Sequence, residues 1–247
     1  YGSKKVIIKK HFSQYQKWGG FPEVVFAKSL FEKRKILKEY FGAMFFKDLV
    51  DRFNMSNTVL IEVLTDKLFS SFSQKLSLRA FARQYKGIFP FSRDSLYEYY
   101  KNVLKSGLIY EIKKFAESTY KRRRNPAKIY TADTGLARRV TSEDSGKLLE
   151  NLVFLELRKA YEGYIYYFEG KRECDFVVRE GNGFSAYQVC FELSAGNRER
   201  EINGLVECCK WLKKKKGVLL TAGQEERLRE EGIEIVILPV WRWLLAK

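Results

Sequence analysis

The sequence is poor in the residue types that build most catalytic and zinc-binding sites. His11 is its one histidine, which excludes most Ser/His/Asp and Cys/His arrangements and argues against a zinc site. The four cysteines include no C-x-x-C pair, and the adjacent Cys208 and Cys209 suit an ordinary disulfide poorly. Together with Cys174 and Cys190, they are expected to be small buried thiols in a reducing compartment.

Long apolar runs and a phosphate-binding loop are also missing. No apolar run approaches the roughly 20 residues that span a bilayer, and the N-terminal YGSKKVIIKK has no signal-peptide core. We therefore expect a soluble, cytoplasmic protein without a membrane partner. The pattern G-x-x-x-x-G-K-[ST] is absent, because Gly163 has the wrong spacing from Gly170-Lys171 and Arg172 follows. An ATPase site is therefore not expected in this stretch of chain.

Positive charge is present in excess and is unevenly distributed. The 247 residues carry a formal net charge of +16, and 45% hydrophobic with 15% aromatic content is enough for two well-buried cores. Residues 1–141 hold 29 basic and 12 acidic side chains, whereas residues 142–247 hold 17 and 18. Abundant Lys and Glu are common in thermophiles. Segregation of the charge favours instead a polyanion-binding surface on the first part.

Residues 1–55 are predicted to form a helical connector. The stretch Trp18-Gly19-Gly20-Phe21-Pro22 ends one helix, and Glu23 helps to begin the next. From Phe26 to Phe53 apolar residues recur near helical spacing, with a predicted break at Gly42. No residue type here points to catalysis.

Residues 56–141 are predicted to form a winged helix-turn-helix. The signals are three helix caps, one helix stop and two alternating strands, at Ser56-Asn57, Ser77, Ser92, Gly107, Leu108–Ile112 and Ala127–Thr131. In this fold the third helix enters the major groove of DNA and the wing lies along the phosphates.

The outward surface of this module is expected to be basic. The third helix should bury Leu96, Tyr100, Val103 and Leu104. The predicted DNA-binding residues lie on the opposite face of that helix and on the wing, and are Arg93, Tyr97, Lys101, Lys105, Lys121, Arg122, Arg123 and Arg124. Such cations supply affinity rather than sequence choice, and only Asn102 is an amide that could read adenine. A protein-contact role is the alternative, which the basic wing disfavours.

Residues 142–247 are predicted to form an α/β domain with a mixed sheet. After a polar loop at residues 141–145, the expected elements are helices and strands in alternation: a helix from Gly146, strands Tyr164–Phe168, Glu173–Val178 and Ala186–Leu193, a helix Arg198–Trp211, a strand Gly217–Thr221, a helix Glu225–Glu231, a strand Ile233–Leu238 and an apolar tail Trp241–Ala246.

Acidic and polar residues fall at related places on these elements. Glu150 lies at the rim of the helix's apolar stripe, Asp175 shares a strand face with Glu173, and Gln188 shares one with Cys190. This arrangement resembles the core of the PD-(D/E)XK nucleases. The resemblance implies that Glu150, Asp175 and Gln188 are catalytic and bind Mg²⁺ or Mn²⁺, which lowers the pKa of a bound water for phosphodiester hydrolysis.

Cys190 stands where the nuclease family has a lysine. Loss of one preorganised charge that assists the nucleophile costs about 100- to 1000-fold in rate. Arg198 or Arg200, at the start of the following helix, could substitute for it. Cys190 itself is expected to pack in the core, since no histidine base is near it in sequence.

Structural roles for the two carboxylates are left open by the sequence. Glu150 can be an ordinary helix-surface carboxylate, and Asp175 can pair with Arg172 or Lys171.

A wider set of motifs spans nearly the whole chain. They are Gly19-Gly20-Phe21-Pro22-Glu23, Phe46-Lys47-Asp48-Leu49-Val50, Lys128-Ile129-Tyr130, Asp133-Thr134-Gly135-Leu136 and Leu149-Glu150-Asn151. In this order they resemble the C-terminal half of the archaeal AAA+ ATPase family. The resemblance implies an upstream P-loop ATPase domain as a partner, an oligomer, and a DNA-binding, nuclease-like role for this region. The alternative is a catalytically degenerate nuclease fold that binds DNA or protein.

Overall fold

The computed structural model describes residues 2–116, 118, 125–138 and 144–246. The chain divides into two compact units. Unit 1 contains Tyr1–Phe12, Ile112–Asn125 and Ser145–Lys247, and unit 2 contains Ser13–Glu111 and Pro126–Asp144. Each unit has its own cluster of buried hydrophobic side chains.

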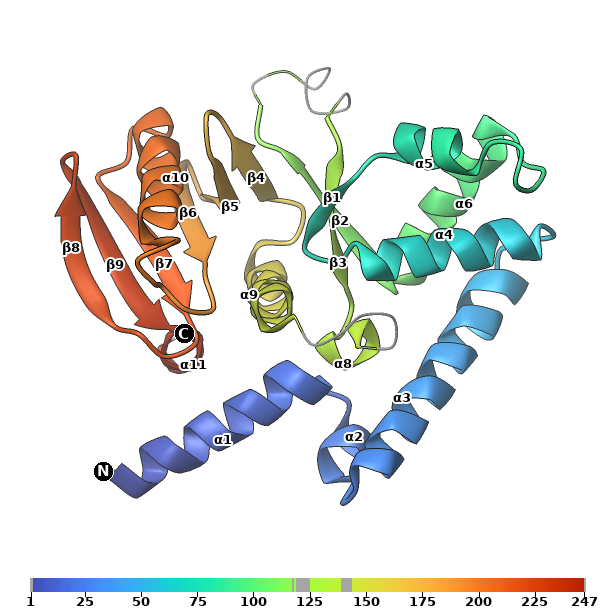
Figure 1. The fold of residues 1–247 in the computed structure, drawn as a ribbon, viewed down its shortest axis with the longest axis horizontal. Coiled ribbons are helices and arrows are strands. Elements are labelled where there is room, and N and C mark those ends of the chain that lie inside the picture. Colours follow the sequence, from blue (N-terminus) through green and yellow to red (C-terminus); the bar gives the residue numbers. More distant parts are fainter. Residues whose placement is uncertain (1, 117, 119–124, 139–143, 247) are drawn as a thin grey trace. The chain divides into compact units, whose positions relative to one another are not determined.

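Unit 2 is built mainly from helices (Figure 1). They are the end of α1 (Gly2–Trp18), α2 (Pro22–Phe26), α3 (Leu30–Ala43), the π-helix η1 (Met44–Asp51), α4 (Thr58–Ser70), α5 (Leu78–Tyr85), α6 (Arg93–Ser106) and α8 (Thr134–Ala137). Strand β1 (Gln74–Leu76) pairs antiparallel with β3 (Ala127–Thr131), and β2 (Ile109–Lys114) follows α6.

Local side-chain chemistry sets the helix boundaries in unit 2. The side chains of Asn57, Ser77 and Ser92 each accept a hydrogen bond from the backbone N–H three residues later, at 3.0, 3.3 and 2.9 Å. Gly107 ends α6 with φ +79°, a left-handed conformation that suits glycine. These three caps and this stop are confirmed as predicted.

Unit 1 is built around a mixed sheet. Its strands are the end of β2 together with β4 (Ile165–Glu169), β5 (Glu173–Glu180), β6 (Gly183–Val189), β7 (Lys216–Thr221), β8 (Glu226–Glu230) and β9 (Ile233–Pro239). The spatial order is β2-β4-β5-β6-β7-β9-β8. The pairs β4–β5, β5–β6 and β8–β9 are antiparallel, whereas β2–β4, β6–β7 and β7–β9 are parallel.

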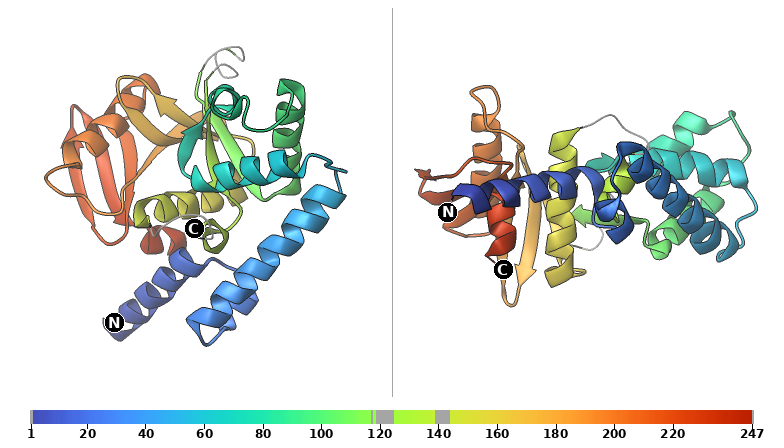
Figure 2. Two further views of the ribbon diagram at one scale, coloured as in Figure 1. Left: turned by 45° about the vertical axis from the view of Figure 1, so that its right-hand side comes forward. Right: turned by 90° about the horizontal axis from the view of Figure 1, so that it is seen from below.

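Helices α9 (Ser145–Tyr161) and α10 (Arg198–Trp211) cover this sheet, and α11 (Val240–Leu245) follows β9. Helix α9 packs on β4, β5 and β6, and α10 packs on β5, β6, β7 and β9. The views in Figures 1 and 2 place α9 and α10 on different faces of the strands. Gly204 allows α10 to approach closely, because a Cβ there would lie 2.3 Å from the carbonyl oxygen of Glu173.

Three local predictions are corrected by the structure. The stretch predicted as a helix at Glu225–Glu231 forms strand β8, which pairs with β9. Strand β6 ends at Val189, so Cys190 lies beyond the strand and not on its face. Gly42 lies inside α3 and does not break it. The apolar tail after β9 forms the short helix α11. In the described part of the chain, no helix is long and apolar enough to cross a membrane.

Candidate functional site

Two sequence motifs distant in the chain meet in unit 2. The carboxylate of the buried Asp133 accepts hydrogen bonds from the backbone N–H of Gly20 at 2.8 Å and of Gly135 at 2.7 Å. Gly19 has φ +79°, and a Cβ at Gly19 would overlap the Asp133 carboxylate, while a Cβ at Gly135 would lie 2.3 Å from the carbonyl oxygen of Trp18. Burial raises the pKa of Asp133, and the amide hydrogen bonds oppose that rise. The contacts of these two motifs are therefore structural.

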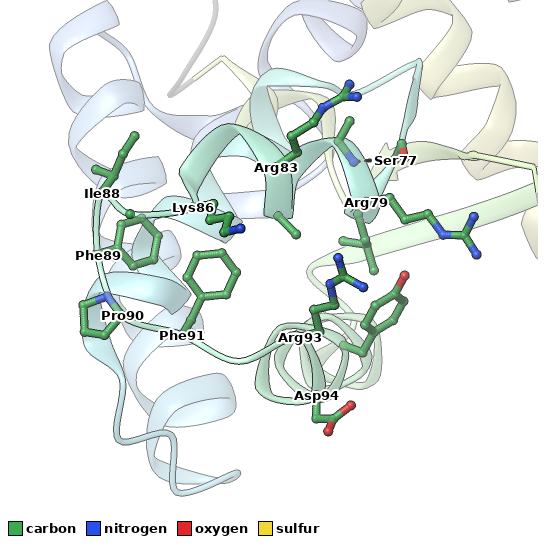
Figure 3. Close-up of a pocket in the computed structure, with 15 residues that line it drawn as sticks. Ser77, Arg79, Arg83, Lys86, Ile88, Phe89, Pro90, Phe91, Arg93 and Asp94 are labelled. Carbon is green, nitrogen blue, oxygen red and sulfur yellow. Dashed lines mark hydrogen bonds between the residues drawn. The ribbon is translucent and has the colours of Figure 1, made fainter.

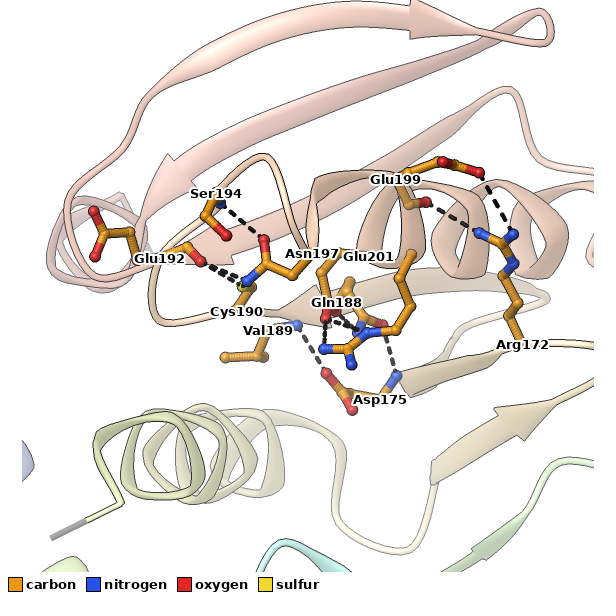
Figure 4. A network of polar contacts seen from close by, with 11 residues as sticks. Arg172, Asp175, Gln188, Val189, Cys190, Glu192, Ser194, Asn197, Glu199 and Glu201 are labelled. Carbon is orange, nitrogen blue, oxygen red and sulfur yellow. Dashed lines mark hydrogen bonds and ion pairs between the residues drawn. The ribbon is translucent and has the colours of Figure 1, made fainter.

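Two of the three predicted nuclease residues, Asp175 and Gln188, belong to a polar network in unit 1 (Figure 4). The backbone N–H of Asp175 donates to Oε1 of Gln188 at 3.1 Å, and Oδ2 of Asp175 accepts from the N–H of Val189 at 2.9 Å. Nε2 of Gln188 donates to Oε2 of Glu201 at 2.6 Å. Arg200 closes the network by donating Nε and Nη2 to Oε1 of Glu201 at 3.0 and 2.5 Å. The network ties β5, β6 and the first turn of α10 together.

Cys190 follows β6 at the edge of this network and is not prepared for nucleophilic chemistry. Its thiol donates to the carbonyl oxygen of Glu192 at 3.2 Å, and Nδ2 of Asn197 lies 3.6 Å from its sulfur. Burial, followed by the negative charge of Glu201, raises the pKa of the Cys190 thiol to about 11. The thiol is therefore protonated at neutral pH, and it supplies no positive charge where the nuclease family has a lysine.

The structure distinguishes between the two candidate substitutes for that lysine. Arg198 pairs with Glu226 through Nη2 at 2.6 Å, away from the network. Arg200 pairs with Glu201 and carries its charge within electrostatic reach of Asp175 and Cys190. Of the two, Arg200 is therefore the residue positioned beside the predicted site.

Arg172 and Glu150 are two further positions that the sequence singled out in unit 1. Arg172, a proposed partner of Asp175, instead places its guanidinium on Glu199, with Nη1 3.2 Å from the backbone oxygen and Nη2 3.7 Å from Oε1. Glu150 is half-buried on α9, which packs against β5 and β6.

The predicted ligand set, Glu150, Asp175 and Gln188, does not offer a divalent cation the oxygen atoms that it needs. Mg²⁺ and Mn²⁺ take several oxygen ligands and retain waters. Both polar atoms of the Gln188 side chain are already hydrogen bonded within the network, and one carboxylate oxygen of Asp175 is bound by an amide. Among the described residues, no group of three or more His, Cys, Asp or Glu side chains could hold a metal ion. The arrangement around Gln188 therefore does not fit a bound divalent cation.

A second candidate surface follows helix α6 in unit 2. Arg93, Tyr97, Lys101 and Lys105 are all exposed, at intervals of four residues. The opposite face is buried, since Leu96, Tyr100 and Val103 are at most 8% exposed and Leu104 is half-buried. This division of the helix is as predicted. The predicted wing residues Lys121, Arg122, Arg123 and Arg124 lie outside the described residues.

Asn102, the amide considered for reading adenine, does not lie on the outward face. It is 8% exposed and is therefore unavailable to a groove beside α6. The outward face carries three cations and a phenol, which suit phosphate contacts, together with the exposed carboxylates of Asp94 and Glu98.

An open pocket lies beside α6 in unit 2 (Figure 3). Its volume is about 1280 Å³, and α5, residues 86–91 and the first turns of α6 line it. Four cations contribute to the lining, namely Arg79, Arg83, Lys86 and Arg93, against the single carboxylate of Asp94. None of these four cations has a hydrogen bond or ion pair with another residue in the described ranges. The pocket is therefore rich in cations that are available to a ligand.

Several of these residues were not identified from the sequence. Glu201 is hidden in the charged run Arg198-Glu199-Arg200-Glu201, where nothing marks it as buried. Arg79 and Arg83 are four residues apart on the predicted second helix, and this spacing is a signal that places them on one face. The stretch Ile88-Phe89-Pro90-Phe91 is an apolar loop between two helices, a pattern that could have drawn attention to a binding surface.

Comparison with known proteins identifies the two halves of the chain. Residues 9–147 match the profile "Domain of unknown function (DUF8612)", and residues 145–243 match "Domain of unknown function (DUF4143)". The chain is 32% identical over 255 residues to "Uncharacterized protein MJ1544" of Methanocaldococcus jannaschii, covering 98% of this chain and 57% of the relative. It is 25% identical over 244 residues to an "Uncharacterized protein" of Haemophilus influenzae, covering 97% and 59%.

The chain therefore spans less than two thirds of the length of these curated relatives. The DUF8612 profile covers more than half of the chain, and the DUF4143 profile begins where it ends. The chain belongs to the DUF8612 family and carries a DUF4143 domain in its C-terminal part.

Proposed function

We propose that this chain is a DNA-binding module whose nuclease-like domain is catalytically degenerate. The observation that carries the proposal is the stripe of exposed Arg93, Tyr97, Lys101 and Lys105 on α6. Its three cations have no hydrogen bond or ion pair with any described residue, so no protein contact must be broken when they bind an anion.

The stripe matches the dimensions of a DNA groove contact. Arg93 and Lys105 are twelve residues apart, which corresponds to about 18 Å along the helix axis at 1.5 Å per residue. Duplex DNA carries a phosphate every 3.4 Å along each strand, so a helix of this length can meet several phosphates. The 14-residue α6 also has the length of a helix that crosses a major groove.

The order of elements supports a winged helix-turn-helix for this part. Helices α4, α5 and α6 are followed by β2 and β3, and β1 precedes α5 and pairs with β3. In that fold α6 is the recognition helix and the β2–β3 connection, with Lys121, Arg122, Arg123 and Arg124, is the wing. The wing is expected to add affinity through further phosphate contacts.

The second part is proposed to have the PD-(D/E)XK fold without its chemistry. Support for the fold comes from the mixed sheet flanked by α9 and α10, with Asp175 and Gln188 on neighbouring strands. Support for loss of activity comes from the protonated thiol of Cys190 and from Gln188, whose amide is bound to Glu201. In this proposal the network of Asp175, Gln188, Glu201 and Arg200 stabilises the domain.

The larger protein is proposed to be an archaeal-type AAA+ ATPase. The motif order of the chain supports this, and the curated relatives are longer than the region that matches. Reading the rest of those relatives for G-x-x-x-x-G-K-[ST] tests the idea, because its absence removes the phosphate-binding loop on which the proposal depends.

The DNA-binding proposal is tested by fluorescence anisotropy with a labelled duplex over a range of salt concentrations. The variant Arg93→Ala/Lys101→Ala/Lys105→Ala removes three cations from the stripe. If each neutralises one phosphate, the slope of log K against log salt should become shallower by about 2.7, and affinity in 0.1 M salt should fall roughly 100- to 500-fold.

A matched control is offered by α3 of the same unit, which also has 14 residues. Arg34→Ala/Lys35→Ala/Lys38→Ala removes the same residue types from exposed positions of that helix. We expect the DNA affinity of the control to lie within about threefold of the wild-type affinity, since surface cations away from the contact change only the overall electrostatic potential of the protein. Equal slopes for the wild type and the α6 variant overturn the proposal.

Metal-dependent hydrolysis is the second candidate. Arg200, which carries its charge within electrostatic reach of Asp175, is the observation that favours it. Linear, branched and single-stranded DNA incubated with Mg²⁺ or Mn²⁺ should remain intact if the domain is degenerate. Cleavage that disappears in both Asp175→Ala and Glu150→Ala would establish a nuclease and refute the degenerate assignment.

A further inference from the structure

The pocket beside α6 combines two kinds of side chain that seldom share a purely structural surface. Arg79 and Arg83 belong to α5, Lys86 to the following loop and Arg93 to α6, and all four are exposed. In Figure 3 the charged ends of Lys86 and Arg93 lie in the space between the two helices, whereas those of Arg79 and Arg83 extend outward from α5 and Asp94 points away from the space. The pocket therefore presents an excess of positive charge to whatever enters it.

The opposite wall of the pocket is aromatic and held in place from behind. Phe89 and Phe91 line the pocket with ring centroids 5.2 Å apart. Phe91 packs against the buried Phe81 at 6.3 Å, and Phe89 packs against Tyr85 at 5.8 Å. These contacts restrain both half-buried rings, so a ligand that stacks on them need not order them first.

We infer that this pocket holds an unpaired nucleotide of the DNA that α6 contacts, with its base against Phe89 and Phe91 and its phosphates on the surrounding cations. This inference rests on the proposed DNA binding. Aromatic rings interleaved with cations are the arrangement by which proteins hold single-stranded nucleic acid. A base within a duplex has both faces covered by its neighbours, so only an unpaired or extruded base can offer one to a protein ring.

One DNA molecule can contact both the α6 stripe and the pocket, because the two share residues. Arg93 belongs to the α6 stripe and also lines the pocket, and Tyr97 does the same. A duplex on α6 therefore ends or opens next to the aromatic wall. The preferred substrate class is a duplex with a single-stranded tail or gap, rather than a continuous duplex.

The experiment compares a blunt duplex with the same duplex carrying a short single-stranded tail, at one salt concentration. The wild type is expected to bind the tailed duplex more tightly than its added charge explains. Phe89→Leu keeps an apolar side chain but removes the stacking surface, and should lower the preference for the tail by roughly 5- to 100-fold. Phe31→Leu, on an exposed phenylalanine of α3 outside the pocket, is the matched control and should leave the preference unchanged.

A second variant and a second measurement protect the test against a folding defect. Arg79→Ala/Arg83→Ala changes only exposed side chains and should also reduce the preference for the tail. In the wild type, 2-aminopurine placed at the first unpaired position should lose fluorescence on binding, because it stacks on the rings. An unquenched 2-aminopurine in a bound complex overturns the inference.

The outcomes separate this inference from the DNA-binding proposal. If no DNA binds, both fail. If the blunt duplex binds through the α6 stripe but the tail adds nothing, only the pocket inference fails. If an acidic peptide displaces the tailed duplex at equal charge, and Phe89→Leu abolishes peptide binding, the pocket belongs to a protein partner and the nucleotide assignment is overturned.

Discussion

Replacing Gly19 with alanine is expected to destabilise unit 2 through a residue 114 positions away. A Cβ at Gly19 would lie 1.8 Å from Oδ1 of Asp133, which is far too close for two non-bonded atoms. The carboxylate must move, and it then releases the backbone amides of Gly20 and Gly135, which it now binds at 2.8 and 2.7 Å.

The magnitude follows from these contacts. The positive φ of Gly19 costs an alanine about 1–2 kcal/mol. Each amide hydrogen bond to the carboxylate contributes about 1.5–3 kcal/mol, so loss of one or both brings the expected total to about 2.5–8 kcal/mol. Asp133→Ala removes the same two hydrogen bonds without the backbone strain, and should cost about 3–6 kcal/mol.

The two substitutions act on one contact, so their effects should not add. With the carboxylate already removed, Gly19→Ala has nothing to displace and should cost only its backbone strain. The double variant should therefore be less destabilised than the sum of the singles by about 2 kcal/mol or more.

Urea unfolding followed by the fluorescence of Trp18 measures this cycle. Trp18 is 3% exposed and belongs to unit 2, whereas Trp211, Trp241 and Trp243 belong to unit 1 and can be replaced by phenylalanine in the background. Additivity of the two single variants within about 0.5 kcal/mol would refute the reasoning, because independent sites add to that accuracy.

Two further predictions concern glycine packing and thiol ionisation. Gly204→Ala should destabilise unit 1 by about 1–3 kcal/mol, because its Cβ would meet the backbone of Glu173. Gly42→Ala, whose Cβ would have nothing within 4 Å, should stabilise unit 2 by about 0.8–1 kcal/mol. Urea unfolding of each unit measures both changes in the free energy of unfolding, and changes of the same sign would contradict the packing argument. The pKa of Cys190 is raised from 9.0 to about 11, so the stability linked to this thiol is intact below pH 9 and is lost as the pH rises to 11. Cys190→Ala should flatten that part of the stability profile, and rapid alkylation of Cys190 in the folded protein at pH 8 would count against its burial.

Local patterns predicted most of the helices and strands. The caps at Asn57, Ser77 and Ser92 act through hydrogen bonds that reach only three residues along the chain, so the sequence contains all the atoms involved. The buried and exposed faces of α6 were likewise readable, because a period of 3.6 residues is a property of the helix alone.

The segment Glu225–Glu231 was predicted as a helix and forms a strand because of contacts outside the segment. Residues 225–231 are rich in Glu and Arg, which favour helices. In the fold, Glu226–Glu230 instead pairs with β9 at the edge of the sheet, and the hydrogen bonds of that pairing outweigh a weak local preference. Glu225 and Glu226 also pair with Arg242 and Arg198, which lie far from them in sequence.

The candidate nuclease site was predicted in part. The proximity of Asp175 and Gln188 follows from their positions on two adjacent strands, and in the structure the backbone N–H of Asp175 donates a hydrogen bond to Oε1 of Gln188. The role of Glu201 could not be read in the same way, because it depends on the rotation of α10 against the sheet. Only the packed helix shows that Glu201 is the hydrogen-bond partner of the Gln188 amide nitrogen.

The sequence alone determined features that depend on neighbours within about four residues, namely the helix caps at Asn57, Ser77 and Ser92 and the apolar face of α6, and it also determined the concentration of positive charge in residues 1–141. Tertiary structure decided the contact between Gly20 and Asp133 and the polar network around Gln188. The physical reason is distance along the chain. Such contacts join residues that only packing of the hydrophobic core brings together, and no local propensity encodes which of them will meet.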